Sequence, residues 1–138
     1  MIEIESRELA DIPVLHAYPV GQKDTPLPCA IFYHGFTSSS LVYSYFAVAL
    51  AQAGLRVIMP DAPDHGSRFS SDEARRLNQF WQILLQSMQE FTTLRAAIAE
   101  ENWLLDDRLA VGGASMGAMT ALGITARHPT VKCTASMM

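Results

Sequence analysis

A serine between two glycines stands late in the chain. Residues 113–117 read Gly-Ala-Ser-Met-Gly, which is the pattern G-x-S-x-G. A serine hydroxyl is a weak nucleophile until a base removes its proton. One solution places the serine on a sharp strand-to-helix turn, where small residues two positions before and after it avoid clashes. Gly113 and Gly117 hold those positions, so Ser115 is a candidate nucleophile.

The segments around this motif predict the strand and the helix that such a turn needs. The apolar run "LAV" precedes the motif, and a helical pattern follows it and ends before Pro129. The motif alone is common, and the strand–turn–helix context makes it far more specific. A new helix points free N–H groups toward its start. The amide of Met116 is therefore a candidate donor to an oxyanion formed at Ser115.

A second oxyanion donor is expected from the loop after an earlier buried strand. The apolar run "CAIFY" leads into "HGFTSSS". Gly35 lets the backbone turn close to the serine, and the amide of Phe36 is the candidate donor. In comparable sites each donor contributes roughly a 10²- to 10³-fold rate increase.

The elements that must position these groups alternate along the chain. Strands are expected at 1–9, 12–20, 29–36, 55–63, 108–114 and 131–138, and helices at 41–54, 73–101 and 115–128. Alternating strands and helices predict a mostly parallel sheet covered on both faces, with an antiparallel hairpin at the N-terminal edge. The sequence thus predicts a single α/β domain of three layers over residues 1–138.

Two of the helices carry most of the expected apolar packing. In the segment 41–54, the aromatic cluster Tyr43, Tyr45 and Phe46 favours core packing over an acyl pocket. The segment 73–101 is expected to be one long helix that starts at Ser71 or Asp72 and packs through one apolar face. That face consists of Leu77, Trp81, Leu84, Met88, Phe91, Leu94 and Ile98.

Composition narrows the class of protein. The net charge of −4 argues against nucleic-acid binding. No apolar run reaches the roughly 18 residues that span a bilayer, and the N-terminus is unlike a signal peptide, so we expect a cytoplasmic protein. Cys29 and Cys133 adjoin apolar runs and are expected to be buried, reduced thiols. No Cys/His cluster is present, so no metal or other cofactor is expected.

Three segments together carry a family resemblance. The runs "FYHGF", "MPDAPDHGSR" and "VGGASMGAMTALG", in this order, resemble the N-terminal part of an α/β-hydrolase of the prolyl-oligopeptidase-like branch. The resemblance implies a serine carboxylesterase that hydrolyses small short-acyl esters through an acyl-enzyme. It also implies Ser115 as nucleophile with the Phe36 and Met116 amides as the oxyanion hole. Because these groups serve any acyl transfer, a thioesterase or peptidase is the alternative enzyme.

The base that Ser115 needs is missing from this stretch of sequence. No Asp or Glu follows Ser115, and the one later histidine, His128, lies at the far end of the same predicted helix, roughly 20 Å away. A base must come within about 3 Å. His34 and His65 precede the serine and are expected to brace loops. We therefore expect the N-terminal portion of a longer enzyme, cut before the triad acid and base and weak or inactive alone.

A non-catalytic interpretation remains open. The last predicted strand is apolar and nothing in the sequence covers its outer edge. An unpaired strand edge is a template for pairing with another chain. The alternative is therefore an assembly-dependent fragment that associates with a second copy through this C-terminal sheet edge.

Overall fold

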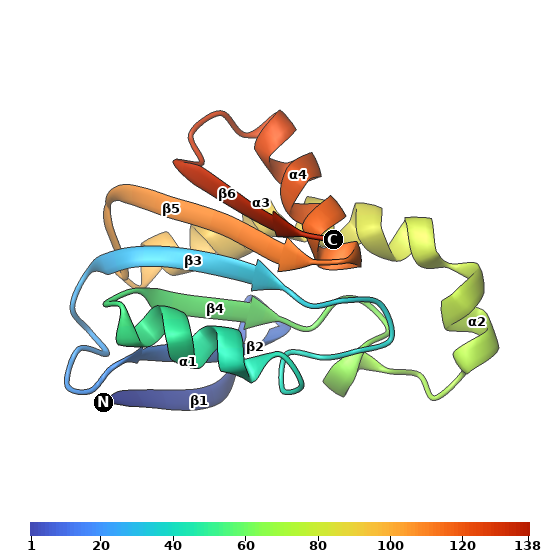
Figure 1. The fold of residues 1–138 in the computed structure, drawn as a ribbon, viewed down its shortest axis with the longest axis horizontal. Coiled ribbons are helices and arrows are strands. Elements are labelled where there is room, and N and C mark those ends of the chain that lie inside the picture. The colour runs from blue at the N-terminus through green and yellow to red at the C-terminus, as the bar shows by residue number, and fades with distance from the viewer.

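The computed structural model describes residues 1–138 as a six-stranded sheet between two layers of helices (Figure 1). The strands are β1 (Ile2–Leu9), β2 (Ile12–Pro19), β3 (Leu27–Tyr33), β4 (Arg56–Pro60), β5 (Leu104–Ala114) and β6 (Cys133–Met137). The helices are α1 (Ser44–Gln52), α2 (Glu73–Asn78), α3 (Phe80–Glu100) and α4 (Met116–Arg127), with a 3₁₀ turn, η1, at Gly66–Arg68.

The sheet has the predicted mixture of strand directions. Its order is β1-β2-β4-β3-β5-β6, in which β1 pairs with β2, and β2 with β4, in antiparallel fashion. The remaining neighbours, β4-β3, β3-β5 and β5-β6, are parallel. The prediction of a mostly parallel sheet with an N-terminal antiparallel hairpin is confirmed.

Helices bury both faces of the central strands. On one face, α3 and α4 cover a large core in which Ile31 and Val111 pack with Phe91. On the other face, α1 covers a smaller core that contains Phe32 and Met59. Successive residues of a strand point to opposite faces, so a strand buried on both sides must be apolar at almost every position. This requirement explains the continuous apolar runs of β3 and β4.

The expected single helix over residues 73–101 is wrong. The structure breaks it at Gln79, whose backbone leaves the helical region (φ −117°, ψ 22°), so α2 and α3 are separate helices. Asp72 caps α2 by accepting a hydrogen bond from the Arg75 amide. The break removes the first residues from the apolar face, and Leu77 and Trp81 are both 62% exposed instead of packed.

The expectation of two buried cysteines holds for one of them. Cys29 is buried in β3, whereas Cys133 is exposed on β6. Cys133 lies on the edge strand β6, where its side chain borders open pockets that no helix covers. An apolar groove of about 390 Å³ runs beside α1 over β3, β5 and β6, lined among others by Phe46, Gly112 and Met137.

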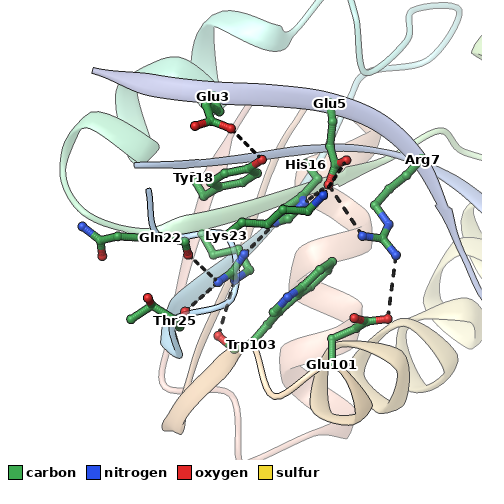
Figure 2. Close-up of polar contacts among 11 residues, drawn as sticks. Glu3, Glu5, Arg7, His16, Tyr18, Gln22, Lys23, Thr25, Glu101 and Trp103 are labelled. Carbon is green, nitrogen blue, oxygen red and sulfur yellow. Dashed lines mark hydrogen bonds and ion pairs between the residues drawn. The ribbon is translucent and has the colours of Figure 1, made fainter. Parts of the chain in front are cut away.

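A buried arginine ties the N-terminal hairpin to the parallel strands (Figure 2). The Arg56 guanidinium donates to the carbonyls of Gln22 and Thr25, at 3.2 and 2.7 Å, and to the His16 ring nitrogen Nε2 at 2.8 Å. The other ring nitrogen, Nδ1, lies 2.7 Å from the Glu5 carboxylate. Figure 2 shows these contacts around the Trp103 ring, which stacks on His16 at 4.3 Å. A chain of polar contacts therefore fixes the start of β4 against β2 and β1.

Candidate active site

Ser115 occupies a strained turn between β5 and α4. Its backbone has φ 57° and ψ −118°, a conformation that costs free energy for a residue with a side chain. A Cβ at Gly113 would lie 2.2 Å from the Gly117 carbonyl, and one at Gly117 would lie 2.0 Å from the Tyr33 carbonyl oxygen. Neither position has room for a side chain. The two glycines therefore allow the close backbone approach that this turn requires.

The turn is also held from the neighbouring strand. The amide of Ser115 donates a 2.7 Å hydrogen bond to the carbonyl of Met137, at the end of β6. The serine hydroxyl itself has no partner among the side-chain hydrogen bonds of the chain. The backbone is thus fixed, whereas the hydroxyl makes no hydrogen bond within the chain.

Two backbone amides near Ser115 have no acceptor within the chain. Met116 is the first residue of α4, so its N–H has no partner inside the helix. Phe36 lies in the loop after β3, and its N–H makes no hydrogen bond either. The preceding residue, Gly35, brings this loop close, because a Cβ built on it would stand 3.6 Å from Cβ of Ser115. The arrangement leaves two donors free beside the serine.

Two buried histidines brace the loop that carries Phe36. The Nε2 atom of His34 accepts from the Ala62 amide at 3.0 Å, and its Nδ1 atom lies 2.8 Å from the Gly35 carbonyl. The Nε2 atom of His65 accepts from the Thr37 amide at 2.8 Å, and its Nδ1 atom lies 2.9 Å from the Pro63 carbonyl. The loop-bracing role predicted for both residues is confirmed.

These contacts require both histidines to be neutral. Each ring donates through Nδ1 and accepts through Nε2, so neither has a lone pair left to take a proton from Ser115. Burial lowers the pKa of His34 and of His65 below the usual value, because the charged form would lose its hydration. The two rings therefore serve as fixed hydrogen-bonding groups and not as bases.

Asp61 is a third brace, and the sequence analysis missed it. Its carboxylate accepts from the Ser40 amide at 3.0 Å and from the amide and hydroxyl of Ser67 at 3.3 and 3.0 Å. These bonds hold its pKa below the usual value although burial works in the opposite direction. The signal was an acidic residue directly after a buried strand, at the carboxyl end of β4. Asp61 joins the loop after β3 to the loop after β4.

Apolar side chains line one side of this region. Met116 is buried and packs with Ala62, Ile83 and Leu84, and Phe36 packs against the same group. The Phe36 ring also meets the Phe80 ring at 5.0 Å in an edge-to-face contact. The start of α3 therefore supports the residue whose amide is the candidate oxyanion donor.

No histidine of the chain is placed to act as base for Ser115. His128 follows the last turn of α4, away from the elbow, and its ring packs on Phe91 at 4.8 Å. His16 belongs to the Arg56 network at the opposite end of the sheet.

The chain also has no group of three His, Cys, Asp or Glu side chains that could hold a metal ion. None of its helices is long and apolar enough to cross a membrane.

The sheet topology and its covering helices define an α/β-hydrolase fold. The crystal structure of TT1662 from Thermus thermophilus matches 99% of this chain and 56% of its own length with a TM-score of 0.75 at 23% identity. A cold-adapted esterase from an Arctic intertidal metagenomic library matches 98% of this chain and 59% of its own length with a TM-score of 0.73 at 21% identity.

Residues 25–137 match the family described as serine aminopeptidase, S33, and the chain belongs to this family. Over all 138 residues it is also 97% identical to the protein named esterase YjfP of Escherichia coli strain K12. The chain spans about half the length of the curated relatives it matches, with 55% of that E. coli protein covered.

Proposed function

We propose that this chain is the nucleophile-bearing part of a serine carboxylesterase that hydrolyses short-acyl esters. The strained elbow at Ser115, with glycines packed against backbone on both sides, is the observation that supports the proposal most directly. The 97% identical E. coli relative named an esterase favours an ester over other acyl compounds. The catalytic acid and base come, in this proposal, from residues outside 1–138, and the cytoplasm remains the expected location.

The proposed reaction has two stages. In the first, Ser115 Oγ attacks the ester carbonyl carbon while the base takes the hydroxyl proton, and a tetrahedral oxyanion forms facing the amides of Phe36 and Met116. The C–O bond to the alcohol then breaks, and the alcohol leaves with the proton from the base. In the second stage, water attacks the acyl-enzyme by the same route and releases the acid and free Ser115.

The test needs a protein that carries the complete site. We define the graft protein as the full-length E. coli relative in which the matching segment is replaced by this chain. A fluorophosphonate probe should add to the Ser115 hydroxyl of the graft protein and shift its intact mass by one adduct. Ser115→Ala should abolish both the adduct and the hydrolysis of p-nitrophenyl acetate. Equal labelling of the Ser115→Ala protein would overturn the assignment of the nucleophile.

The 138-residue chain alone provides the matched comparison. Because no base lies within reach of Ser115, the chain should hydrolyse the aryl ester at only a small fraction of the graft protein's rate. Circular dichroism on the same sample shows whether the chain is folded. A folded chain with the full turnover of the graft protein would contradict the proposed origin of the base.

A substrate panel separates esterase from the alternative enzymes. p-Nitrophenyl esters from acetate to decanoate, an acyl thioester and an aminoacyl p-nitroanilide share the same acyl-transfer step and differ in acyl length or leaving group. We expect the highest kcat/KM with the shortest oxygen esters. A preference for the anilide would instead support a peptidase, which the description of the family suggests.

Self-association through the sheet edge is the second candidate. The unpaired edge of β6, next to the apolar groove over β3, β5 and β6, supports it. Analytical ultracentrifugation of the 138-residue chain should then give a dimer that dissociates when Thr134, in the middle of β6, is replaced by proline. A monomer at all concentrations would exclude this candidate.

A further inference from the structure

We propose that Tyr43 is a further catalytic residue, whose hydroxyl donates a hydrogen bond to the substrate oxyanion beside the Phe36 and Met116 amides. The proposal rests on Ser115 being the nucleophile, as argued above. It assigns a side-chain donor to a site that is otherwise built from backbone amides.

The position of the hydroxyl carries the argument. Gly35 has no side chain, and the point that its Cβ would occupy lies 2.9 Å from Tyr43 Oη and 3.6 Å from Ser115 Cβ. The hydroxyl and the nucleophile therefore approach the same small space from two sides. The Phe36 amide follows Gly35 directly in the chain, so the phenol and this amide belong to one surface next to Ser115.

The hydroxyl has no partner of its own. Tyr43 Oη takes part in none of the side-chain hydrogen bonds of the chain, and it is not among the buried polar atoms cut off from solvent. A phenol O–H in a half-buried position normally finds an acceptor. The acceptor that the reaction creates at this place is the negatively charged oxygen of the tetrahedral intermediate, which forms strong, charge-assisted hydrogen bonds.

Aromatic packing keeps the phenol in place before the substrate arrives. The Tyr43 ring lies 6.0 Å from the Tyr45 ring and 6.0 Å from the Phe46 ring, and both pairs are stacked. The Tyr43 amide also donates to the Ser39 carbonyl at 3.3 Å just before α1 begins. A donor that is fixed in advance costs little reorganisation when charge develops in the transition state.

The chain offers a closely matched pair of variants. Tyr43→Phe removes one oxygen atom and keeps the ring in its stack. Tyr45→Phe makes the same change two residues later, on a side chain that is 59% exposed and stacks on the same ring. Only the first change should affect catalysis if the hydroxyl acts on the oxyanion.

The decisive experiment measures ester hydrolysis by the graft protein and these two variants. We expect Tyr43→Phe to lower kcat by about 10- to 100-fold with little change in KM, because the bond forms only to the charged intermediate. Tyr45→Phe should keep the parent rate, and thermal unfolding should show that both variants stay folded. An unchanged kcat for Tyr43→Phe would overturn the proposal.

A transition-state analogue distinguishes a direct bond from an indirect structural effect. A trifluoromethyl ketone adds to the serine and forms an oxyanion, so its affinity should fall by about the same factor as kcat/KM in Tyr43→Phe. A loss of kcat/KM without this loss of affinity would also refute the direct hydrogen bond. Turnover by Ser115→Ala would refute the assignment of Ser115 as the nucleophile. An inactive Ser115→Ala together with a fully active Tyr43→Phe would refute only the role of the Tyr43 hydroxyl.

Discussion

Acid should destabilise the protein through His16, a residue far from Ser115. The ring is fully buried, with Arg56 on one nitrogen and Glu5 on the other. Burial, together with the charge of Arg56, lowers the pKa of His16 to about 4, from an ordinary value of 6.5. As the pH falls, the unfolded chain therefore binds a proton before the folded protein does. Stability decreases with falling pH below 6.5, and this loss ends near pH 4.

The size of the effect follows from the gap between the two pKa values. A difference of about 2.5 pH units at roughly 1.4 kcal/mol per unit gives a full loss of about 3.5 kcal/mol, of which about 3 kcal/mol is reached at pH 4, where the folded ring is half protonated. A whole domain is typically stable by only about 5–15 kcal/mol. One buried histidine should therefore account for a substantial part of the acid sensitivity.

Urea unfolding of the graft protein at several pH values measures this loss. His16→Gln is the comparison, because the amide oxygen of glutamine can accept from Arg56 and does not titrate in this range. Its free energy of unfolding should fall less steeply between pH 6.5 and 4, by up to about 1.4 kcal/mol per pH unit. Parallel pH profiles of the two proteins, or a histidine signal from His16 titrating near 6.5 by NMR, would refute the reasoning.

Two further predictions concern the elbow and its neighbouring loop. Gly117→Ala should unfold the turn or abolish activity, because the new Cβ would lie 2.0 Å from the Tyr33 carbonyl oxygen. Gly123→Ala is the control and should be tolerated, since its Cβ meets only a flexible methionine side chain. Equal losses of activity and of thermal stability in the two variants would contradict this prediction. His65→Leu should lower kcat about tenfold or more by leaving the Thr37 amide without an acceptor, and an unchanged kcat would show that the brace is dispensable.

The strands and the elbow could be predicted because local patterns determine them. Apolar runs mark strands buried on both faces, and two glycines around Ser115 indicate a turn that excludes side chains. The break at Gln79 has no such signal, since neither proline nor glycine lies there. Phe80, the first residue of α3, packs edge-to-face on Phe36, a tertiary contact that the local sequence does not specify. The exposure of Cys133 likewise depends on which elements cover the face of β6, which composition does not specify.

Only some of the contacts in the candidate site could be predicted from the sequence. The roles of His34 and His65 could be inferred from their place before glycines at the ends of buried strands. The place of Asp61 directly after a buried strand marked it as a candidate, but its partners Ser40 and Ser67 lie on two segments that meet only in the folded protein. Tyr43 was expected in the core, and only the folded loop shows its hydroxyl near Ser115.

The hydrogen bond from the Ser115 amide to the Met137 carbonyl has a consequence for the order of folding. During synthesis, β5 and the elbow leave the ribosome before β6 does. β3 lies at the centre of the sheet, and β5 and then β6 add outward from it. The strained turn therefore receives its last backbone contact only after the chain has been made as far as Met137. Until then the early strands can assemble around a relaxed elbow, and the pairing of β6 with β5 coincides with the fixing of the Ser115 backbone.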